Sequence, residues 1–179
     1  PQYMIDVPNT YSAENLDYVE KQLRGMVSFI EENSSFRLDE NRLLETVQRS
    51  KNTIENFRKI LDLRADRYLS DEMTSQMLSV FATHVMLGTP EAEKYSADMI
   101  KQLSALPAER KGVRLLWVHT LPYWQDTLRD LINFTDRCEI AACDMVFDAL
   151  DVNTQEKNPY RFMADRLLRN TVNGSRDNR

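Results

Sequence analysis

Residues 113–124 (VRLLWVHTLPYW) constrain the fold of this chain more than any other stretch. The first half of the segment is a run of mostly apolar residues, and the second half is a polar, aromatic loop that contains Pro122. A short apolar run that ends in such a loop is typical of a buried parallel strand that leads into a ligand site. We therefore expect a parallel α/β element in this part of the chain.

The residues before this segment carry mainly helical periodicity. Apolar residues recur at three- and four-residue intervals over most of residues 12–106, which predicts four helices. Residues that commonly cap or start helices precede the four runs, at Ser12, Asp39, Ser70 and Thr89-Pro90. The chain has only four glycines and six prolines, which favours long helices over many turns. Residues 3–7, closed by Pro8, form an extended segment that we interpret as a short strand.

The second part of the chain predicts the order strand, helix, strand, helix. The strands are expected at residues 113–118 and 139–147, a helix at 123–136, and a further helix starting at Pro159. A right-handed crossover would make the two strands parallel and adjacent. Because two strands are too few for a stable parallel sheet, the α/β part reads as incomplete. The predicted class is α+β to α/β, with a mainly helical region at 1–108 and the beginning of an α/β lobe at 109–179.

Composition excludes several kinds of partner. The formal charge is −5, with 23 basic and 28 acidic residues and no long basic block, so nucleic acid is not expected as a partner. No run approaches the roughly 18 apolar residues that a membrane span needs, and no secretion signal is present. We therefore expect a cytoplasmic protein that does not contact a membrane. Because the chain begins at Pro1, we interpret it as a piece of a longer protein.

Polar and aromatic residues follow the two predicted strands. In open parallel sheets, ligands bind beyond the carboxyl ends of the strands. The candidate substrate-binding residues are therefore His119, Thr120, Tyr123 and Trp124 after the first strand and Asp148 after the second. Here the imidazole could donate to a carbonyl or a phosphate, and the aromatic rings could stack on a planar group. The alternative is that His119 satisfies a backbone group and that the aromatic side chains cover the edge of the sheet.

No complete catalytic or metal-binding motif is present. The loop after the first strand has no phosphate-binding glycines, and no nucleophile elbow occurs. Asp144 and Asp148 suggest a pair of carboxylates for acid–base catalysis, but the two would face the same side only if the second strand were regular. Ordinary polar residues at a strand end are therefore the preferred interpretation. Cys138 and Cys143 lack metal-ligand spacing and are expected to be reduced packing residues. We assign no catalytic residue and no metal ligand to this chain.

Several short motifs, in their order and spacing, carry a family resemblance. They are Ile5-Asp6-Val7-Pro8, Tyr18-Val19-Glu20-Lys21-Gln22-Leu23, Leu38-Asp39-Glu40-Asn41-Arg42-Leu43, Arg114-Leu115-Leu116-Trp117, the acidic end of the second strand, and Asn158-Pro159-Tyr160-Arg161. With these motifs the chain resembles the second half of a 2-hydroxyacyl-CoA dehydratase subunit, in the superfamily that includes the benzoyl-CoA reductases. The resemblance implies two flavodoxin-like lobes with a helical segment between them. The α/β part would then be an incomplete flavodoxin-like lobe.

The resemblance also implies a chemistry for the parent protein. The parent would hold a 4Fe-4S cluster through cysteines from both lobes and accept one electron from an ATP-dependent activator protein. It would then eliminate water from a 2-hydroxyacyl-CoA through a ketyl radical, working with a second dehydratase subunit or domain. Cys138 and Cys143 do not stand at the ligand positions of the family, so we expect no cluster and no activity in this chain alone.

Two other functions fit the residues. A helical protein-interaction module would bind a partner through its amphipathic helices and expose a large apolar patch. A small α/β domain for a small ligand, without redox chemistry, would bind that ligand without iron.

Overall fold

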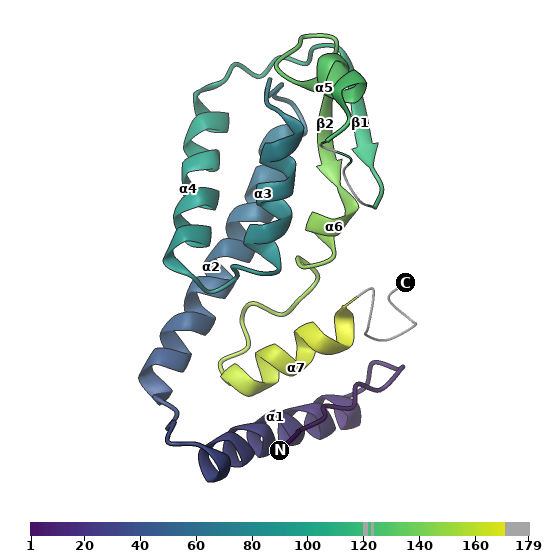
Figure 1. Ribbon diagram of the computed structural model, residues 1–179. Coiled ribbons are helices and arrows are strands. Elements are labelled where there is room, and N and C mark those ends of the chain that lie inside the picture. Colours follow the sequence, from purple (N-terminus) through teal and green to yellow (C-terminus); the bar gives the residue numbers. More distant parts are fainter. Residues whose placement is uncertain (120–121, 123, 171–179) are drawn as a thin grey trace. The chain divides into compact units, whose positions relative to one another are not determined.

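The computed structural model describes residues 1–119, 122 and 124–170 (Figure 1). The elements of these residues, in chain order, are α1 (Ala13–Asn33), α2 (Glu40–Arg64), α3 (Met73–Thr83), α4 (Pro90–Ala105), β1 (Val113–Trp117), α5 (Asp126–Ile132), β2 (Cys138–Cys143), α6 (Asp144–Phe147) and α7 (Pro159–Arg169). Helices combine with a two-stranded parallel sheet, so the predicted mixed class is confirmed. None of the described helices has the length and apolarity that crossing a bilayer requires.

The described residues form two compact units. Unit 1 contains residues 1–48 and the residues from 151 on, and unit 2 contains residues 49–150. These two units are defined by contacts within the folded chain, whereas the boundary expected near residue 108 was based on a change in sequence periodicity. That boundary stays a prediction.

Three of the four predicted helix starts in the first part of the chain are confirmed. Ser12 Oγ accepts the Asn15 amide, Asp39 Oδ1 accepts two amides at the start of α2, and Thr89 Oγ1 accepts the Ala92 amide. The start expected at Ser70 is wrong, because α3 begins at Met73. The Met73 amide donates to Asn133 Oδ1 at 3.0 Å, so a tertiary contact rather than a local cap satisfies this helix start.

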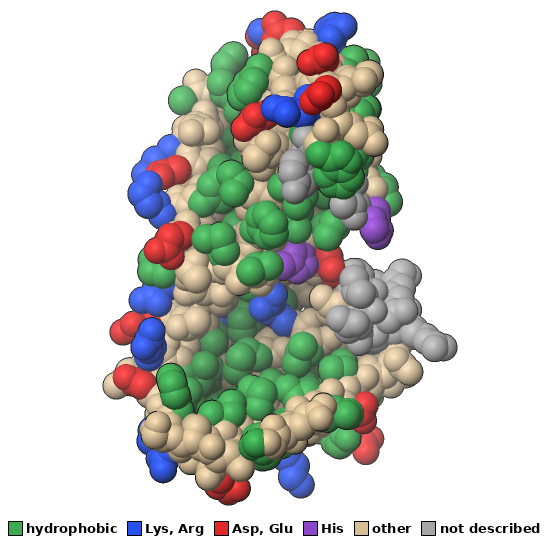
Figure 2. All heavy atoms as spheres, viewed as in Figure 1, with side chains coloured by type: hydrophobic (Ala, Val, Ile, Leu, Met, Phe, Trp, Pro, Cys, Tyr) green, Lys and Arg blue, Asp and Glu red, His purple; other side chains and the backbone are tan. Residues whose placement is uncertain are grey.

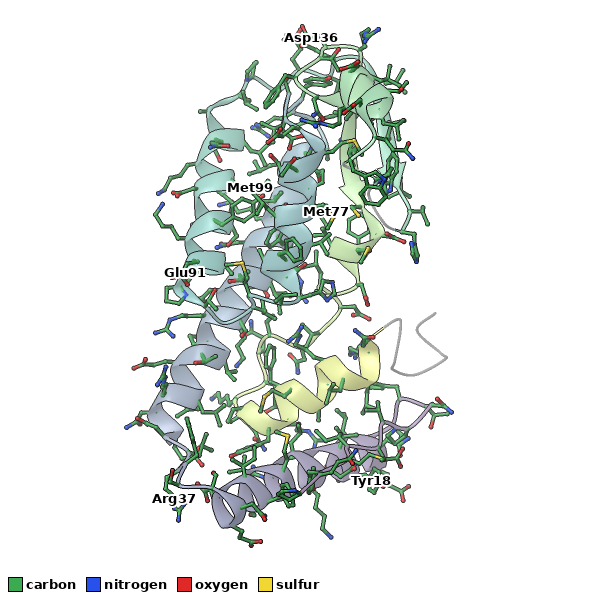
Figure 3. The ribbon with its side chains drawn as sticks, viewed as in Figure 1. Tyr18, Arg37, Met77, Glu91, Met99 and Asp136 are labelled. Atoms are coloured by element: carbon green, nitrogen blue, oxygen red, sulfur yellow. The ribbon has the colours of Figure 1, made fainter. Side chains whose placement is uncertain are left out.

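The extended segment at residues 3–7 lies along α1 and does not pair with a strand in the described structure. The Gln22 side chain takes the place of a strand neighbour, since it accepts the Asp6 amide and donates to the Asp6 carbonyl, both at 2.8 Å. Tyr18, also on α1 (Figure 3), donates from its hydroxyl to Asp6 Oδ2 at 3.2 Å. Tyr3 donates to the Gln22 carbonyl at 2.9 Å. A glutamine side chain can satisfy extended backbone in this way because its amide is both donor and acceptor.

The core of unit 1 lies between α1 and α7. Its most buried side chains come from both helices and are Leu16, Val19, Leu23, Tyr160, Ala164 and Leu168. The Arg24 guanidinium lies over the Tyr160 ring, 4.1 Å from its centroid. This cation–π contact adds to the packing between α1 and α7.

Asn158 joins the same two helices through both ends of its amide. Asn158 Oδ1 accepts the Tyr160 and Arg161 amides at the start of α7, while its Nδ2 donates to Glu20 Oε1 of α1 at 2.7 Å. Arg161 Nη1 is paired with the Asp17 carboxylate of α1. The Asn158-Pro159-Tyr160-Arg161 motif therefore docks α7 onto α1.

Unit 2 contains the sheet, whose strands are parallel and adjacent as predicted. Val113 pairs with Cys138 and Trp117 with Cys143, with a register shift between Leu115 and Leu116. The second strand is shorter than the expected 139–147, because Asp144 begins α6 instead of continuing the strand. The Asp144 carboxylate accepts the Met145 amide at 2.7 Å, a local bond that competes with extended structure.

A buried ion network ties the sheet to α2. Glu139 and Arg64 are both 3% exposed, and Glu139 Oε2 lies 3.4 Å from Arg64 Nη2. Arg114, which faces Glu139 across the strands, donates from Nε to Glu139 Oε1 at 2.9 Å. Arg64 also donates to the Ile140 carbonyl at 2.7 Å. Asp71 accepts from Gln76 Nε2 at 2.9 Å and lies 3.9 Å from Arg64 Nη1. Buried charges persist in such a site because each has an opposite charge or a hydrogen bond.

Replacing Asn158 tests the docking of α7 onto α1. Asn158→Ala removes an N-cap and the bond to Glu20, so the free energy of unfolding of unit 1 should fall by about 2 kcal/mol. Ser12→Ala is the matched control, since it removes a cap with one amide bond and should cost about 1 kcal/mol. Urea unfolding of the two variants measures the difference. Equal losses would show that the bond to Glu20 contributes nothing.

The pH dependence of stability tests the ion network. Burial raises the pKa of the Asp71 carboxyl from 3.8 to about 6, with Arg64 and Gln76 opposing the rise and Glu139 and Glu72 adding to it. The folded state therefore holds this proton more tightly than the unfolded chain. The stability contributed by Asp71 is present below about pH 4 and is lost as pH rises through about 6.

Asp71→Asn cannot titrate, so the free energy of unfolding of the variant relative to the wild type should rise between about pH 4 and 7. The rise should reach up to about 3 kcal/mol, which is about two pKa units at 1.36 kcal/mol each. Asp98→Asn is the control, because bonds to Lys94 and Lys101 lower the pKa of this exposed carboxyl. An equal rise in both variants would contradict the assignment to Asp71.

Candidate functional site at the strand ends

The carboxyl ends of β1 and β2 meet at one edge of the sheet. The last register pair, Trp117 with Cys143, brings the two ends side by side. A loop that begins with Val118 and His119 follows β1, and α6 follows β2 directly. His119 and Asp144 therefore lie at the same edge of the sheet, which is where ligands bind in open parallel sheets.

His119 has an uncommon backbone conformation. Its φ is 71°, in the left-handed region that a β-carbon disfavours. Its backbone N–H donates to Asp144 Oδ1 at 2.8 Å, and the residue is exposed. Strained backbone of this kind occurs often at ligand sites and persists only where the surroundings determine it.

Asp144 is anchored by its neighbours. Besides the His119 amide, Asp144 Oδ1 accepts the Met145 amide at 2.7 Å and lies 3.9 Å from Cys143 Sγ. Because one of its oxygens accepts two backbone amides, the Asp144 carboxylate is suited to fixing the local backbone. Asp148, directly after α6, donates its amide to the Asp144 backbone carbonyl at 3.1 Å.

His84, at the end of α3, contributes a contact that sequence reasoning missed. Its Nε2 lies 2.6 Å from the Met145 carbonyl, and because a carbonyl only accepts, this nitrogen carries the proton. The bond ties α3 to the first turn of α6, next to Asp144. No pattern in the sequence connects these two residues, which are 61 positions apart.

The predicted substrate-binding residues fall into two groups. His119, Trp124 and Asp148 are described, and Trp124 is 61% exposed just before α5. Thr120 and Tyr123 lie outside the described residues. Contact between these residues and a substrate stays a prediction.

The space beside the strand ends is small. A cavity of about 20 Å³ lies next to the end of β2 and is lined in part by Arg64, Gln76, Ser79, Met99 and Cys143. This volume holds roughly one water molecule. This cavity is therefore too small for an organic ligand.

The two cysteines are free and buried. Burial raises the pKa of the Cys143 thiol, and Cys138 Sγ donates to the Leu131 carbonyl at 3.3 Å. Iron–sulfur clusters are held by thiolates. Among residues 1–119, 122 and 124–170, no three or more His, Cys, Asp or Glu side chains are grouped to hold a metal ion. The described residues therefore do not fit as the ligand set of a cluster.

Comparison with known proteins identifies the family. The model of the family described as 2-hydroxyglutaryl-CoA dehydratase, D-component, matches residues 1–179. No curated protein and no solved structure matches the chain. The match covers every motif on which the resemblance rested. The chain belongs to the 2-hydroxyglutaryl-CoA dehydratase D-component family.

Proposed function

We propose that this chain is part of a subunit of a 2-hydroxyacyl-CoA dehydratase, and that the edge at the ends of β1 and β2 faces the acyl-CoA substrate. The observation that carries the proposal is the family match over the whole of residues 1–179. The reaction class is elimination of water from a 2-hydroxyacyl-CoA to give an enoyl-CoA. The position of His119 directly after β1, bonded to Asp144 at the end of β2, supports the proposed substrate side.

The proposal includes a radical route in the parent protein. The β-proton that is lost is not activated, and acid–base catalysis alone removes such protons poorly. One electron, delivered by an ATP-dependent activator, would convert the thioester to a ketyl radical anion, which would expel the 2-hydroxyl group as hydroxide. The β-proton leaves more readily from the resulting radical, and the electron would be given back as the enoyl-CoA forms. A 4Fe-4S cluster would supply the electron chemistry, and its ligands would lie outside the described residues. The parent protein would work together with a second dehydratase subunit or domain. We place this reaction in the cytoplasm.

The proposal also includes completion of the α/β lobe by further parallel strands of a flavodoxin-like sheet. The apolar side chains of Val113, Leu116 and Val118 are each more than 60% exposed at β1. Parallel strands are normally covered on both faces, so this exposure favours further sheet and helix packing in the parent protein.

Within this site, the residues of the chain would bind and orient the substrate. The His119 imidazole is suited to donate to the thioester carbonyl or to a phosphate oxygen. The Trp124 ring is suited to stack on the adenine of CoA. Asp148 would contribute a polar contact on the β2 side. None of these roles requires a reactive nucleophile.

A second candidate function has one observation in its favour. Three exposed apolar residues follow one another at three- and four-residue spacing on and just after α3: Leu78, Phe81 and Val85. Figure 2 shows hydrophobic side chains at the surface over α3. Such a stripe is typical of a surface that binds a partner protein. This candidate predicts a protein that acts without iron.

Calorimetric titration with 2-hydroxyglutaryl-CoA tests the substrate edge. Trp124→Ala should weaken binding about tenfold, since base–aromatic stacking contributes about 1–3 kcal/mol. Phe36→Ala is the control, because Phe36 is an exposed aromatic residue of unit 1 and should leave binding unchanged. Unchanged binding in the Trp124 variant would remove this residue from the site.

Iron analysis of the parent protein, purified without oxygen, tests the redox part of the proposal. We expect about four iron atoms and four acid-labile sulfides per parent chain, with the EPR signal of a cluster, and no iron in residues 1–179 alone. A parent without iron after anaerobic reconstitution would contradict the dehydratase proposal and favour the interaction module.

A further inference from the structure

We propose that Asp144 is the positioning residue of the substrate edge, holding the backbone of residues 118–119, directly after β1, in the conformation that presents His119. This inference rests on the proposed function. It assigns Asp144 no contact with the substrate. The sequence had suggested a carboxylate pair with Asp148, and the geometry points to a different role.

The first step is the shared oxygen. Asp144 Oδ1 accepts the His119 amide at 2.8 Å and the Met145 amide at 2.7 Å. One amide belongs to the loop after β1 and the other to the first turn of α6, and they are 25 and one residues from Asp144. Beyond the last strand pair, Trp117 with Cys143, this oxygen continues the connection between the two strand ends.

The second step is the backbone of His119. A left-handed φ at a residue with a β-carbon needs a neighbour that compensates for its cost. The His119 N–H belongs to the peptide plane between Val118 and His119, and its bond to Asp144 Oδ1 fixes that plane. The φ of His119 then sets the direction in which the side chain leaves the plane. Without this acceptor the peptide plane would be free to turn, and the imidazole would leave its place at the strand end.

The third step is the support of Asp144 itself. Cys143 is 2% exposed, and its thiol, whose pKa burial raises, lies 3.9 Å from Asp144 Oδ1. On the other side, His84 donates to the Met145 carbonyl and fixes the first turn of α6 to α3. The acceptor oxygen is therefore held by β2 and by α3 before any ligand arrives. Preorganisation of this kind is what a binding loop requires.

The fourth step concerns charge. CoA carries phosphates, and a carboxylate that faced them would weaken binding through repulsion. Asp144 instead directs Oδ1 to two backbone amides. The role depends on where the acceptor oxygen lies, so an amide oxygen in the same place should serve, and a carboxylate moved by one methylene group should not.

Three substitutions separate position from charge, with 2-hydroxyglutaryl-CoA as the probe in calorimetric titrations of the 179-residue chain. Asp144→Asn keeps the oxygen without the charge and should bind within about threefold of the wild type. Asp144→Glu keeps the charge but displaces the oxygen, and Asp144→Ala removes it; both should bind at least about tenfold more weakly. Asp39→Ala is the matched control, because Asp39 Oδ1 also accepts two amides, in unit 1, and its loss should leave binding unchanged.

Hydrogen exchange at the His119 amide gives a second measurement that needs no ligand. Exchange should be slow in the wild type and in Asp144→Asn, and at least about tenfold faster in Asp144→Glu. If Asp144→Ala does not fold, the Asn and Glu variants still decide the question. Binding by Asp144→Glu as tight as the wild type, or weak binding by Asp144→Asn with slow exchange, would overturn the inference. A wild-type chain that binds no thioester would instead overturn the proposed function. Slow exchange of the His119 amide in that chain would still show that Asp144 holds the His119 backbone.

Discussion

The buried carboxylate of Glu139 is the interaction on which unit 2 depends. It lies on β2, receives Arg114 from β1 and Arg64 from α2, and also accepts the Leu69 amide at 3.2 Å. Arg114 donates to the carbonyls of Arg64 and Ala65 as well, at the end of α2, where the carbonyls have no helical partner. One charged residue thus links β1, β2 and the end of α2. Removing Glu139 would leave the buried Arg64 with only the Asp71 carboxylate, 3.9 Å away, as an opposite charge, which is far more costly than losing a surface pair.

Two of the motifs that carry the resemblance meet where α7 packs on α1. Asn158-Pro159-Tyr160-Arg161 contacts Glu20, which lies in the Tyr18–Leu23 motif, and also Asp17 and Arg24, which flank that motif. Arg114, which begins a third motif, has its partner in Glu139. The residues that mark the family in this chain therefore stabilise the two units, while the proposed substrate edge is built from other residues, apart from Trp117 at the end of β1.

The sequence predicted those features that local rules decide. Ser12, Asp39, Thr89 and Asn158 each satisfy amides within three residues, so their helices could be recognised from composition and spacing. The parallel pairing of the strands followed from chain order and handedness. The start of α3 could not be predicted, because its partner Asn133 is far away in sequence. The same holds for residues 3–7, whose extended backbone bonds to a glutamine side chain instead of a strand.

The sequence predicts where a site would lie, and substrate contact there stays a prediction, but it did not predict how the residues at that edge are connected. The strand-end rule leads to His119 and Trp124 without any structural knowledge. The rule does not show that Asp144 leaves the strand, starts α6 and accepts the amide of His119, since that depends on where β2 ends. Because β2 ends at Cys143, four residues before the expected end, Asp144 and Asp148 lie one helical turn apart instead of four positions apart along a strand. The paired-carboxylate interpretation then loses its basis, and the contacts of Asp144 support the positioning role that we propose for it.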